Sequence, residues 1–426
     1  MELTYDKSYA VHCDLHDPLH SYRDRFHIAE DGLIYLDGNS LGRLPLATEN
    51  AFQGLLQKQW GERLVRSWNE GWYHMSTRLG KKIAQLIGAH PEEVIVCDSV
   101  SVALYKLAYG ALKLRPERTE ILSDDMNFPS DLYVMQGLIR QFGDRHLLRL
   151  VKSTDGVSGN MTDLLRLVST QTALVTLTHT AFKSGFVYDM ERVTELAHMH
   201  GALVLWDLSH SVGAMPIRLK GAGVDLAVGC TYKYLNGGPA APAFLFVRRE
   251  LQEAMENPIQ GWFGDENPFE FRLSYRPAAG IRKFLTSSPP VLAMATLEPA
   301  VDLILEAGLD KIREKSMAQT AYALALAREW LSGLDFRVGS PETADRRGGH
   351  ICLKHAEAYR ICRALTDPSV GGRAVIPDFR EPNNIRLGMS SLYTSYEEIY
   401  MALDQIRAIV RQKLYKKYPQ AKETVT

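Results

Sequence analysis

Short apolar runs alternate with amphipathic stretches through the middle of the chain. The predicted strands lie at residues 93–97, 120–122, 174–177, 202–206 and 224–229, with predicted helices at 102–112, 130–142 and 191–200. Strands separated by helices of about 10–15 residues predict an α/β fold with a mostly parallel sheet covered on both faces. Ligands of such sheets bind beyond the carboxyl ends of the strands.

The pattern changes after Pro289-Pro290. A long helical stretch is predicted over residues 291–331. It is followed by short predicted strands at 336–338, 349–353, 373–375 and 384–387, and by helices at 356–365 and 395–414. This order favours a second, smaller α+β domain. The N-terminal segment is expected to join it, so we expect a large domain at 55–298 and a small domain formed by 1–54 and 299–426.

Composition narrows the classes of function. The 426 residues include 49 basic and 50 acidic side chains, so the chain has no excess of positive charge that would attract nucleic acid or an anionic membrane. No apolar run approaches the ~20 residues of a membrane span, and the N-terminus lacks an apolar signal core. A soluble, cytoplasmic protein is therefore expected. The five cysteines have no CxxC spacing and form no Cys/His cluster with zinc-ligand spacing, which argues against a zinc site. Their odd number argues against a disulfide framework.

Two predicted strands end in a carboxylate and an amine. The run 202–206 leads into Asp207, and the run 224–229 leads into Lys233 and a Gly-Gly-Pro turn. Pyridoxal phosphate (PLP) needs such a pair, because a lysine forms its Schiff base and a carboxylate keeps its pyridine nitrogen protonated. For an arbitrary Asp and Lys, a strand cap and a surface amine would be favoured. The buried strands and the flanking motifs favour the PLP site.

Other segments fit the same cofactor. The serines of 98–101 precede a predicted helix, whose first N–H groups would form an anion cup, although a plain serine cap is the alternative. Tyr232 could add a phenol donor to the phosphate. Phe128 could stack on the pyridine ring or belong to the core, and Asp131 could reach the ring side or cap its helix.

Two further side chains are candidates. His210 lies three residues after Asp207, which returns it to the same sheet edge, although a lone histidine is usually structural. Arg386 is predicted on a small-domain strand, where its guanidinium suits a carboxylate, with an exposed strand arginine as the alternative.

The chain resembles kynureninase, a PLP enzyme of the aspartate-aminotransferase fold (fold type I), over most of its length. The resemblance rests on Arg386 and on the segments YLDGNSLG (35–42), SWN (67–69), FPSD (128–131), DLSH (207–210), YKYLNGGP (232–239), GWFG (261–264) and SSPP (287–290). Together and in this order these motifs are specific, whereas each alone is not.

The resemblance implies roles for these residues. Lys233, Asp207 and Tyr232 would be catalytic, with Tyr232 as the candidate proton donor to Cβ. The implied cofactor-binding residues are Val100, Ser101, Phe128, Pro129, Ser130, Asp131, Thr178, Asp207, His210, Tyr232 and Lys233, with Trp262 and Ser288 of the partner subunit. The implied substrate-binding residues are Arg386 for the α-carboxylate, Trp68 and Ser288 for the aryl ring, and Asn39.

The implied reaction is hydrolysis of L-kynurenine to anthranilate and L-alanine in tryptophan catabolism, a pathway that leads to NAD. It would take place in a homodimer with shared active sites. Two departures stand out. Asp265 follows the GWFG segment where family members often have a histidine, and Ser288 stands where the animal enzymes have an asparagine. The second departure favours kynurenine over 3-hydroxykynurenine.

Two other functions remain open at this point. A cysteine desulfurase or selenocysteine lyase shares the fold but carries a histidine before the lysine and a cysteine on a mobile loop. Here Tyr232 precedes Lys233, Cys352 lies in an apolar strand pattern and Cys362 in a predicted helix. A catalytically inactive regulator on this fold would need a lost lysine or an added DNA-binding module, and neither is present. No GxGxxG segment follows a strand, which argues against a nicotinamide dehydrogenase.

Overall fold

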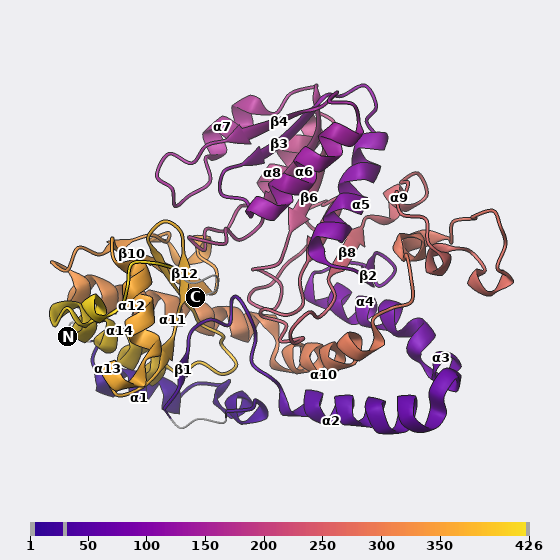
Figure 1. Cartoon of the computed structure of the whole chain (residues 1–426). Coiled ribbons are helices and arrows are strands. Elements are labelled where there is room, and N and C mark those ends of the chain that lie inside the picture. The colour runs from indigo at the N-terminus through magenta and orange to yellow at the C-terminus, as the bar shows by residue number, and fades with distance from the viewer. Residues whose placement is uncertain (1–4, 29–31, 423–426) are drawn as a thin grey trace.

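A seven-stranded sheet forms the centre of the large domain in the computed structural model, which describes residues 5–28 and 32–422 (Figure 1). Its strand order is β2-β8-β7-β6-β5-β3-β4. The strands are β2 (Val94–Val96), β3 (Glu120–Asp124), β4 (Leu147–Val151), β5 (Thr172–Thr178), β6 (Leu203–Asp207), β7 (Leu226–Gly229) and β8 (Phe244–Val247). Strand β8 runs antiparallel to both β2 and β7, whereas the other neighbouring strands of this sheet pair in parallel, so the predicted mostly parallel sheet is confirmed.

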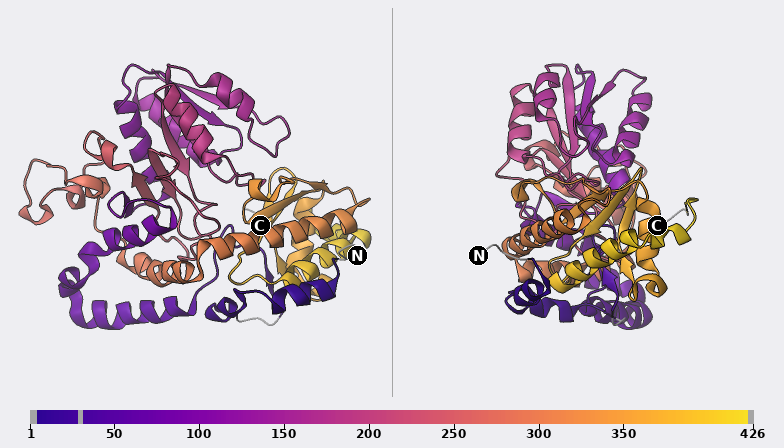
Figure 2. Two further views of the ribbon diagram at one scale, coloured as in Figure 1. Left: turned by 180° about the vertical axis from the view of Figure 1, so that it is seen from behind. Right: turned by 90° about the vertical axis from the view of Figure 1, so that its left-hand side faces the viewer.

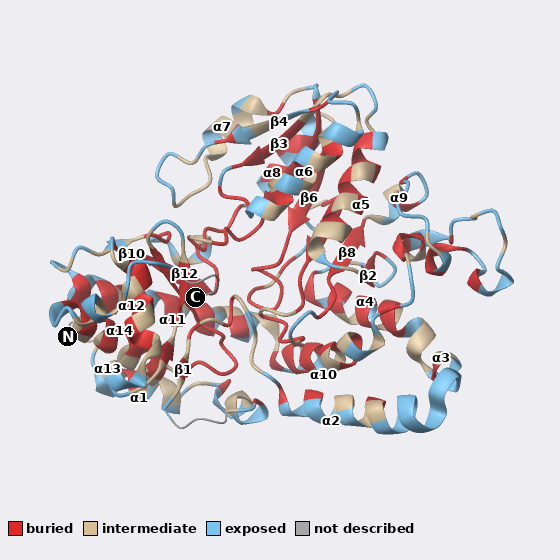
Figure 3. Cartoon of the chain, viewed as in Figure 1, coloured by how far each residue is buried: buried red, intermediate tan, exposed pale blue. Residues whose placement is uncertain are grey.

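Helices cover both faces of this sheet. They include α4 (Met75–Leu86), α5 (Val100–Lys113), α6 (Pro129–Gln141), α7 (Met161–Leu167) and α8 (Met190–Met199). Successive residues of β6 alternate between two hydrophobic clusters, with Val204 and Trp206 in one and Leu203 and Leu205 in the other. Because both faces of the strand are buried, its sequence is a continuous apolar run (Figure 3).

The stretch predicted as one long helical segment after residue 290 contains a break. It forms α10 (Val291–Ala307) and α11 (Leu309–Leu331), with Gly308 between them. Gly308 has a φ of 83°, a left-handed conformation that ends a helix and that glycine adopts without strain. Apolar periodicity continues across the glycine, which is why the pattern predicted no interruption.

The small domain contains a four-stranded antiparallel sheet of order β12-β13-β10-β9. Its strands are β9 (Arg337–Val338), β10 (His350–Lys354), β12 (Asp378–Arg380) and β13 (Asn384–Gly388). Helices α12 (Ala358–Thr366), α13 (Pro368–Gly371) and α14 (Tyr396–Arg411) accompany it. The strand predicted at 373–375 is β11 (Val375–Ile376), which pairs in parallel with β1 (Ile34–Tyr35). The short, charged strand β12 was not predicted.

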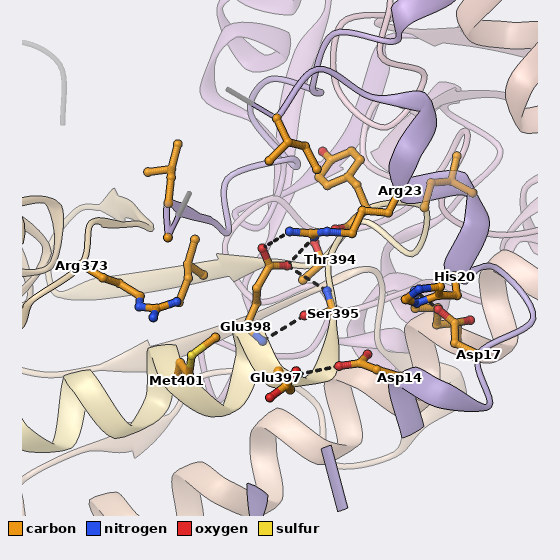
Figure 4. A pocket seen from close by; sticks show the side chains of 17 residues that line it. Asp14, Asp17, His20, Arg23, Arg373, Thr394, Ser395, Glu397, Glu398 and Met401 are labelled. Carbon is orange, nitrogen blue, oxygen red and sulfur yellow. Dashed lines mark hydrogen bonds and ion pairs between the residues drawn. The ribbon is translucent and has the colours of Figure 1, made fainter. Parts of the chain in front are cut away.

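The N-terminal segment packs on this small domain. Helix α1 (Lys7–Leu15) lies beside α14, and the two are also seen together from behind (Figure 2). The Asp14 carboxylate accepts hydrogen bonds from the N–H groups of Tyr396 and Glu397 at 2.8 and 3.0 Å, so it caps α14. Arg23 forms an ion pair with Glu398 at 2.7 Å. These contacts surround a small-domain cavity of about 330 Å³ (Figure 4).

The remaining helical segments lie at the periphery. They are α2 (Leu46–Gly54), a π-helical continuation (Leu55–Arg63), α3 (Ser67–Glu70) and α9 (Arg249–Gln252), together with short 3₁₀ segments. Within residues 5–28 and 32–422, no helix combines the length and apolar character needed to cross a membrane.

Candidate functional site

The parallel neighbours β6 and β7 bring Asp207 and Lys233 to one cavity of about 300 Å³ at the carboxyl edge of the sheet. The cavity is lined by Asp98, Ser99, Val100, Ser101, Phe128, Ser130, Asp131, Asp207, Ser209, His210, Cys230, Tyr232, Lys233, Ala240, Ala241 and Ala243. Most side chains that the sequence indicated for a cofactor therefore meet at a single place.

Asp207 lies at the end of β6, and one of its carboxylate oxygens accepts hydrogen bonds from within the chain. Its Oδ1 accepts hydrogen bonds from the backbone N–H and the hydroxyl of Ser209, at 2.9 and 2.6 Å. No residue of the described chain donates to Oδ2. Burial raises the pKa of Asp207, while Ser209 and the charge of Lys233 oppose that rise. A cationic N–H group placed in the cavity would satisfy the remaining oxygen.

Lys233 points its amine into the same cavity. Its Nζ lies 3.4 Å from Nε2 of His210 and 6.0 Å from the ring centre of Phe128. Burial and the neighbouring charge of Lys233 lower the pKa of His210 well below its usual value, so this histidine is neutral. Neutral His210 can therefore accept a hydrogen bond from the lysine.

The turn that carries Lys233 is held by the N-terminal GNSLG segment. The backbone N–H of Gly42 donates to the carbonyl of Tyr232 at 2.8 Å. A Cβ atom at Gly42 would overlap the Lys233 carbonyl and the side chain of Asn236, so only glycine allows this approach. The motif thus fixes the backbone on which the lysine stands.

The segment before α5 has the features of an anion cup. Ser99 occupies the N-cap position of the alternative interpretation, but its side chain makes no capping hydrogen bond to the helix. The first N–H groups of a helix have no partner within the helix, and its dipole favours an anion there. The Ser101 and Ser130 hydroxyls, 3.0 Å apart, add donors from two helices.

Phe128 and Asp131 lie at the mouth and the wall of the cavity. Phe128 is 41% exposed and meets Phe182 edge to face, so the alternative of a core phenylalanine is wrong. Asp131 makes no side-chain cap of α6, and it is buried in the cavity wall. Burial, and then the charge of Asp207, raise the pKa of Asp131 well above its usual value.

These features fit PLP by their chemistry. An amine, a carboxylate with a free oxygen, an exposed aromatic face and an anion cup line one cavity, as the aldehyde, pyridine nitrogen, ring and phosphate of that cofactor require. Within the described chain, no group of three or more His, Cys, Asp or Glu side chains is arranged to hold a metal ion.

A second cavity of about 680 Å³ adjoins the first and shares Phe128 and Ser130 with it. Its other lining residues are Asp37, Ser40, Pro129, Tyr133, Phe182, Lys183, Asp378, Phe379, Arg380, Glu381 and Lys422. They come from both domains, so this cavity opens between the two. It offers space for a substrate beside the candidate cofactor cavity.

Arg386 lies on β13 and is 1% exposed, so the alternative of an exposed strand arginine is wrong. Its guanidinium forms an ion pair with Asp378 and donates to the Ser40 hydroxyl at 2.9 Å. The Asn39 amide lies beside Arg386, and with its oxygen oriented toward the guanidinium it would accept from Nη2 and Nε at 3.0 Å. The GNSLG segment therefore contacts Arg386 of the small domain as well as the Lys233 turn of the large one.

Asp37 and Asp378 face the larger cavity beside this arginine. Burial, and then the charge of Asp378, raise the pKa of Asp37 to about 7. Sequence reasoning missed both carboxylates. The DGNSLG and DFR segments contain them, but nothing in their spacing indicates that they meet.

Asn39 and Arg386 line neither cavity, and four other predicted site residues also lie outside both within this chain. Thr178 ends β5, opposite Asp207 in the sheet, and its hydroxyl donates to the Thr180 carbonyl at 3.2 Å. Trp68 packs against Trp72 and Phe263, with ring centres 5.6 and 5.7 Å apart. The other two, Trp262 and Ser288, are exposed.

Known sequences similar to this chain are kynureninases. The chain is 38% identical over 407 residues to kynureninase of Pseudomonas fluorescens, covering 94% of this chain and 95% of that protein. It is 39% identical over 406 residues to kynureninase of Burkholderia pseudomallei, covering 94% of each. Residues 312–406 match the family model of the kynureninase C-terminal domain.

Solved structures with the same fold have more distant sequences. Apo cysteine desulfurase from Thermococcus onnurineus NA1 superimposes with a TM-score of 0.80 at 19% identity, over 92% of this chain and 98% of that one. A C-DES mutant with glycine covalently linked to its PLP cofactor gives a TM-score of 0.77 at 17% identity, over 90% and 98%. At these identities the likeness establishes the fold, which is that of fold type I enzymes.

Proposed function

This chain belongs to the kynureninase family, and from that we propose that it hydrolyses L-kynurenine to anthranilate and L-alanine with PLP as its cofactor. One observation carries the proposal. A single cavity holds the Lys233 amine, an Asp207 oxygen without a donor in the described chain, and the anion cup at the start of α5.

The cavity residues have distinct roles toward the cofactor. Asp207 would bind the pyridine nitrogen, Phe128 would cover one ring face, and the 99–101 cup with Ser130 would hold the phosphate. Pro129 shapes the start of α6 beside Phe128, and Thr178 supports Asp207 from the neighbouring strand. When bound, PLP supplies an electron sink for negative charge that develops at the substrate Cα.

Proton movement is assigned to Lys233 and Tyr232. The Lys233 Nζ removes the proton from Cα, and neutral His210, 3.4 Å away, orients that amine. Burial raises the pKa of the Tyr232 phenol above its usual value, so the phenol stays protonated. Addition of water to the Cγ carbonyl lets the Cβ–Cγ bond break with release of anthranilate. A protonated phenol beside the lysine is suited to deliver a proton to Cβ after that cleavage.

Substrate orientation is assigned to the larger cavity. Arg386, held by Asn39 and Ser40, binds the α-carboxylate with its planar fork of donors. The aryl ring extends among the aromatic side chains that line this cavity. Trp68 and Ser288 would approach the aryl ring from the surface that faces a second subunit.

A homodimer with shared active sites completes the assignment. The segment that contains Trp262 projects from the large domain (Figure 1), and its Phe269, Phe271 and Leu273 are 58%, 73% and 107% exposed. A cluster of exposed apolar side chains marks a contact surface. We assign Trp262 and Ser288 to the phosphate side of the partner's cofactor. We further place the enzyme in the cytoplasm and in the kynurenine pathway of tryptophan catabolism, which leads to NAD.

The domain division proposed for the enzyme is 55–298 for the large domain, with 1–54 and 299–426 for the small one. The small-domain core supports this, since it contains Ala10, Ile34 and Leu36 together with residues of α12 and α14. The cofactor would then be bound mainly by the large domain and the substrate carboxylate by the small one.

The experiment begins with the absorbance spectrum of the purified protein in the presence of PLP. We expect visible absorbance, attachment of the cofactor to Lys233 after borohydride reduction, and anthranilate fluorescence when kynurenine is added. A colourless protein that takes up no PLP would overturn the assignment.

A cysteine desulfurase or selenocysteine lyase is the second candidate, favoured by the fold of the structural neighbours. The two thiols of the small domain argue against it. Cys352 lies within β10 at 0% exposure and Cys362 within α12 at 4%, and burial raises the pKa of Cys352 to about 12. Sulfide release from cysteine with no anthranilate from kynurenine would establish this alternative, and absence of both products would favour an inactive regulator.

A further inference from the structure

The candidate phosphate cup contains a carboxylate. Asp98 stands directly before Ser99 and lines the cavity together with Val100 and Ser101. Its φ of 53° is a left-handed conformation that is uncommon for a residue other than glycine. A negative side chain at this place would repel a phosphate unless its charge were compensated.

Lys106 lies within α5, eight residues after Asp98, and its side chain is completely buried. Its Nζ contacts Asp98 Oδ2 at 2.5 Å, the Phe284 carbonyl at 2.7 Å and the Thr286 hydroxyl at 3.3 Å. A buried ammonium needs a counter-ion and hydrogen-bond acceptors, and this one has both.

The second oxygen of Asp98 is engaged as well. The Thr286 hydroxyl donates to Asp98 Oδ1 at 3.1 Å. Lys106 therefore donates to one oxygen of the Asp98 carboxylate, and Thr286 donates to the other. The same contacts join the start of the cup to the 284–286 segment, whose Thr286 carbonyl accepts from the Phe263 N–H at 3.4 Å.

We propose that Lys106 is a positioning residue for the cofactor phosphate, because it neutralises Asp98 and holds that carboxylate so that the cup can accept an anion. This inference rests on the proposed PLP-dependent function. Selective binding of a phosphorylated cofactor would then depend on the ion pair between Lys106 and Asp98 as well as on the donors that line the cup.

The test compares two probes that differ only in the phosphate group. Cofactor is removed from the full-length protein, which is then titrated with PLP and, separately, with pyridoxal. Binding is measured from the absorbance of the adduct that each probe forms with Lys233. We expect Lys106→Met to weaken PLP binding at least about tenfold, which corresponds to 1.36 kcal/mol, and pyridoxal binding less than about threefold. The double variant Lys106→Met/Asp98→Asn should recover most of the PLP affinity. Lys82→Met is the matched control, since Lys82 pairs with Glu298 and Asp302 away from the cavity.

If Lys106→Met weakens the binding of PLP and pyridoxal equally, or leaves the PLP affinity unchanged, the inference is overturned. PLP binding by the unaltered chain would still support the proposed function. Failure of the unaltered chain to bind either probe would instead overturn the proposed function. If Lys106→Met does not fold, Asp98→Asn decides the matter alone. Removal of the negative charge should tighten PLP binding at least about threefold relative to pyridoxal, and an unchanged or weaker affinity would contradict the role assigned to Lys106.

Discussion

At the scale of single residues, burial determines which side chains around the cavity carry charge. The pKa of His210 lies well below its usual value and that of Asp131 well above it, because neither charged form is solvated. Burial also raises the pKa of Tyr232. Lys233 therefore stands among side chains that burial keeps neutral, with Asp207 as the carboxylate whose second oxygen has no donor in the described chain. This arrangement separates a proton carrier, Lys233, from a proton donor, Tyr232.

Replacement of Asp207 tests the pairing with the pyridine nitrogen. We expect Asp207→Asn to keep cofactor binding, because the phosphate cup and Lys233 remain, but to lower kcat by roughly 10²–10⁴-fold. The cofactor spectrum and steady-state kinetics measure the two effects separately. Turnover close to that of the unaltered enzyme would show that Asp207 does not tune the cofactor.

Asp37 should make stability depend on pH. Its pKa in the folded chain is about 7, above the usual value of 3.8, so the folded state holds a proton that the unfolded state has lost between these pH values. Stability should therefore fall as pH rises from about 4 to 7 and then level off. Denaturant unfolding of Asp37→Asn should show a smaller decrease over this range than the unaltered chain. Parallel curves for the two proteins would contradict the raised pKa.

Ser288 is expected to influence substrate choice. A short hydroxyl at this position leaves the 3-hydroxyl of 3-hydroxykynurenine poorly satisfied on burial, at a cost of about 1–3 kcal/mol. This predicts about 5- to 100-fold preference for kynurenine in kcat/KM, and Ser288→Asn should narrow it. Equal kcat/KM for both substrates would remove this role from Ser288 without affecting the catalytic assignment.

At the scale of elements, the GNSLG segment links the two halves of the site. Gly42 contacts the Lys233 turn of the large domain, while Asn39 and Ser40 bind Arg386 of the small domain. One short segment thus sets the distance between the amine that would hold the cofactor and the guanidinium that would hold the substrate carboxylate.

A methyl group at Gly42 should disturb this link. Gly42→Ala would overlap the backbone of the Lys233 turn, so we expect lower thermal stability and at least about tenfold weaker PLP binding. Gly54→Ala is the control, because a Cβ at this helical glycine meets nothing within 4 Å and alanine favours a helix. Measurement of Tm and cofactor affinity compares the two. Equal behaviour of both variants would show that the close approach at Gly42 is not required.

At the scale of the whole molecule, two projecting parts carry exposed apolar side chains. The arm formed by α2, its continuation and the short 3₁₀ segment at Leu64–Arg66 exposes Trp60, Leu64 and Val65. The other projecting segment exposes Phe271 and Leu273 (Figures 1 and 3). These five exposed side chains belong to none of the hydrophobic cores of the described chain. Both are suited to contact a second subunit.

Complementation tests the proposed sharing of sites. Lys233→Ala and Trp262→Ala chains, each inactive alone, are mixed under conditions in which subunits exchange. Half of the dimers in an equal mixture are mixed, and each has one intact site, so about one quarter of full activity should return. No recovery in a mixture shown to exchange would place Trp262 in the site of its own subunit or outside any site.

The sequence alone determined the parts of this protein that depend on local pattern. The central strands and helices, α8 among them, follow from apolar periodicity. The meeting of Asp207 and Lys233 follows from a general rule, since the carboxyl ends of parallel strands share one edge of the sheet. The serines before α5 and the exposed Phe128 were also indicated by residues close to them in the chain.

Only the tertiary structure decided what depends on segments far apart in the sequence. Asn39 and Asp378 meet around Arg386, and Lys106 meets Thr286, through contacts that no spacing along the chain predicts. Gly308 divides a periodic stretch into two helices because its backbone is left-handed there. Hydrophobic periodicity records which face of an element is buried, whereas the identity of the buried neighbour is set by how the elements pack.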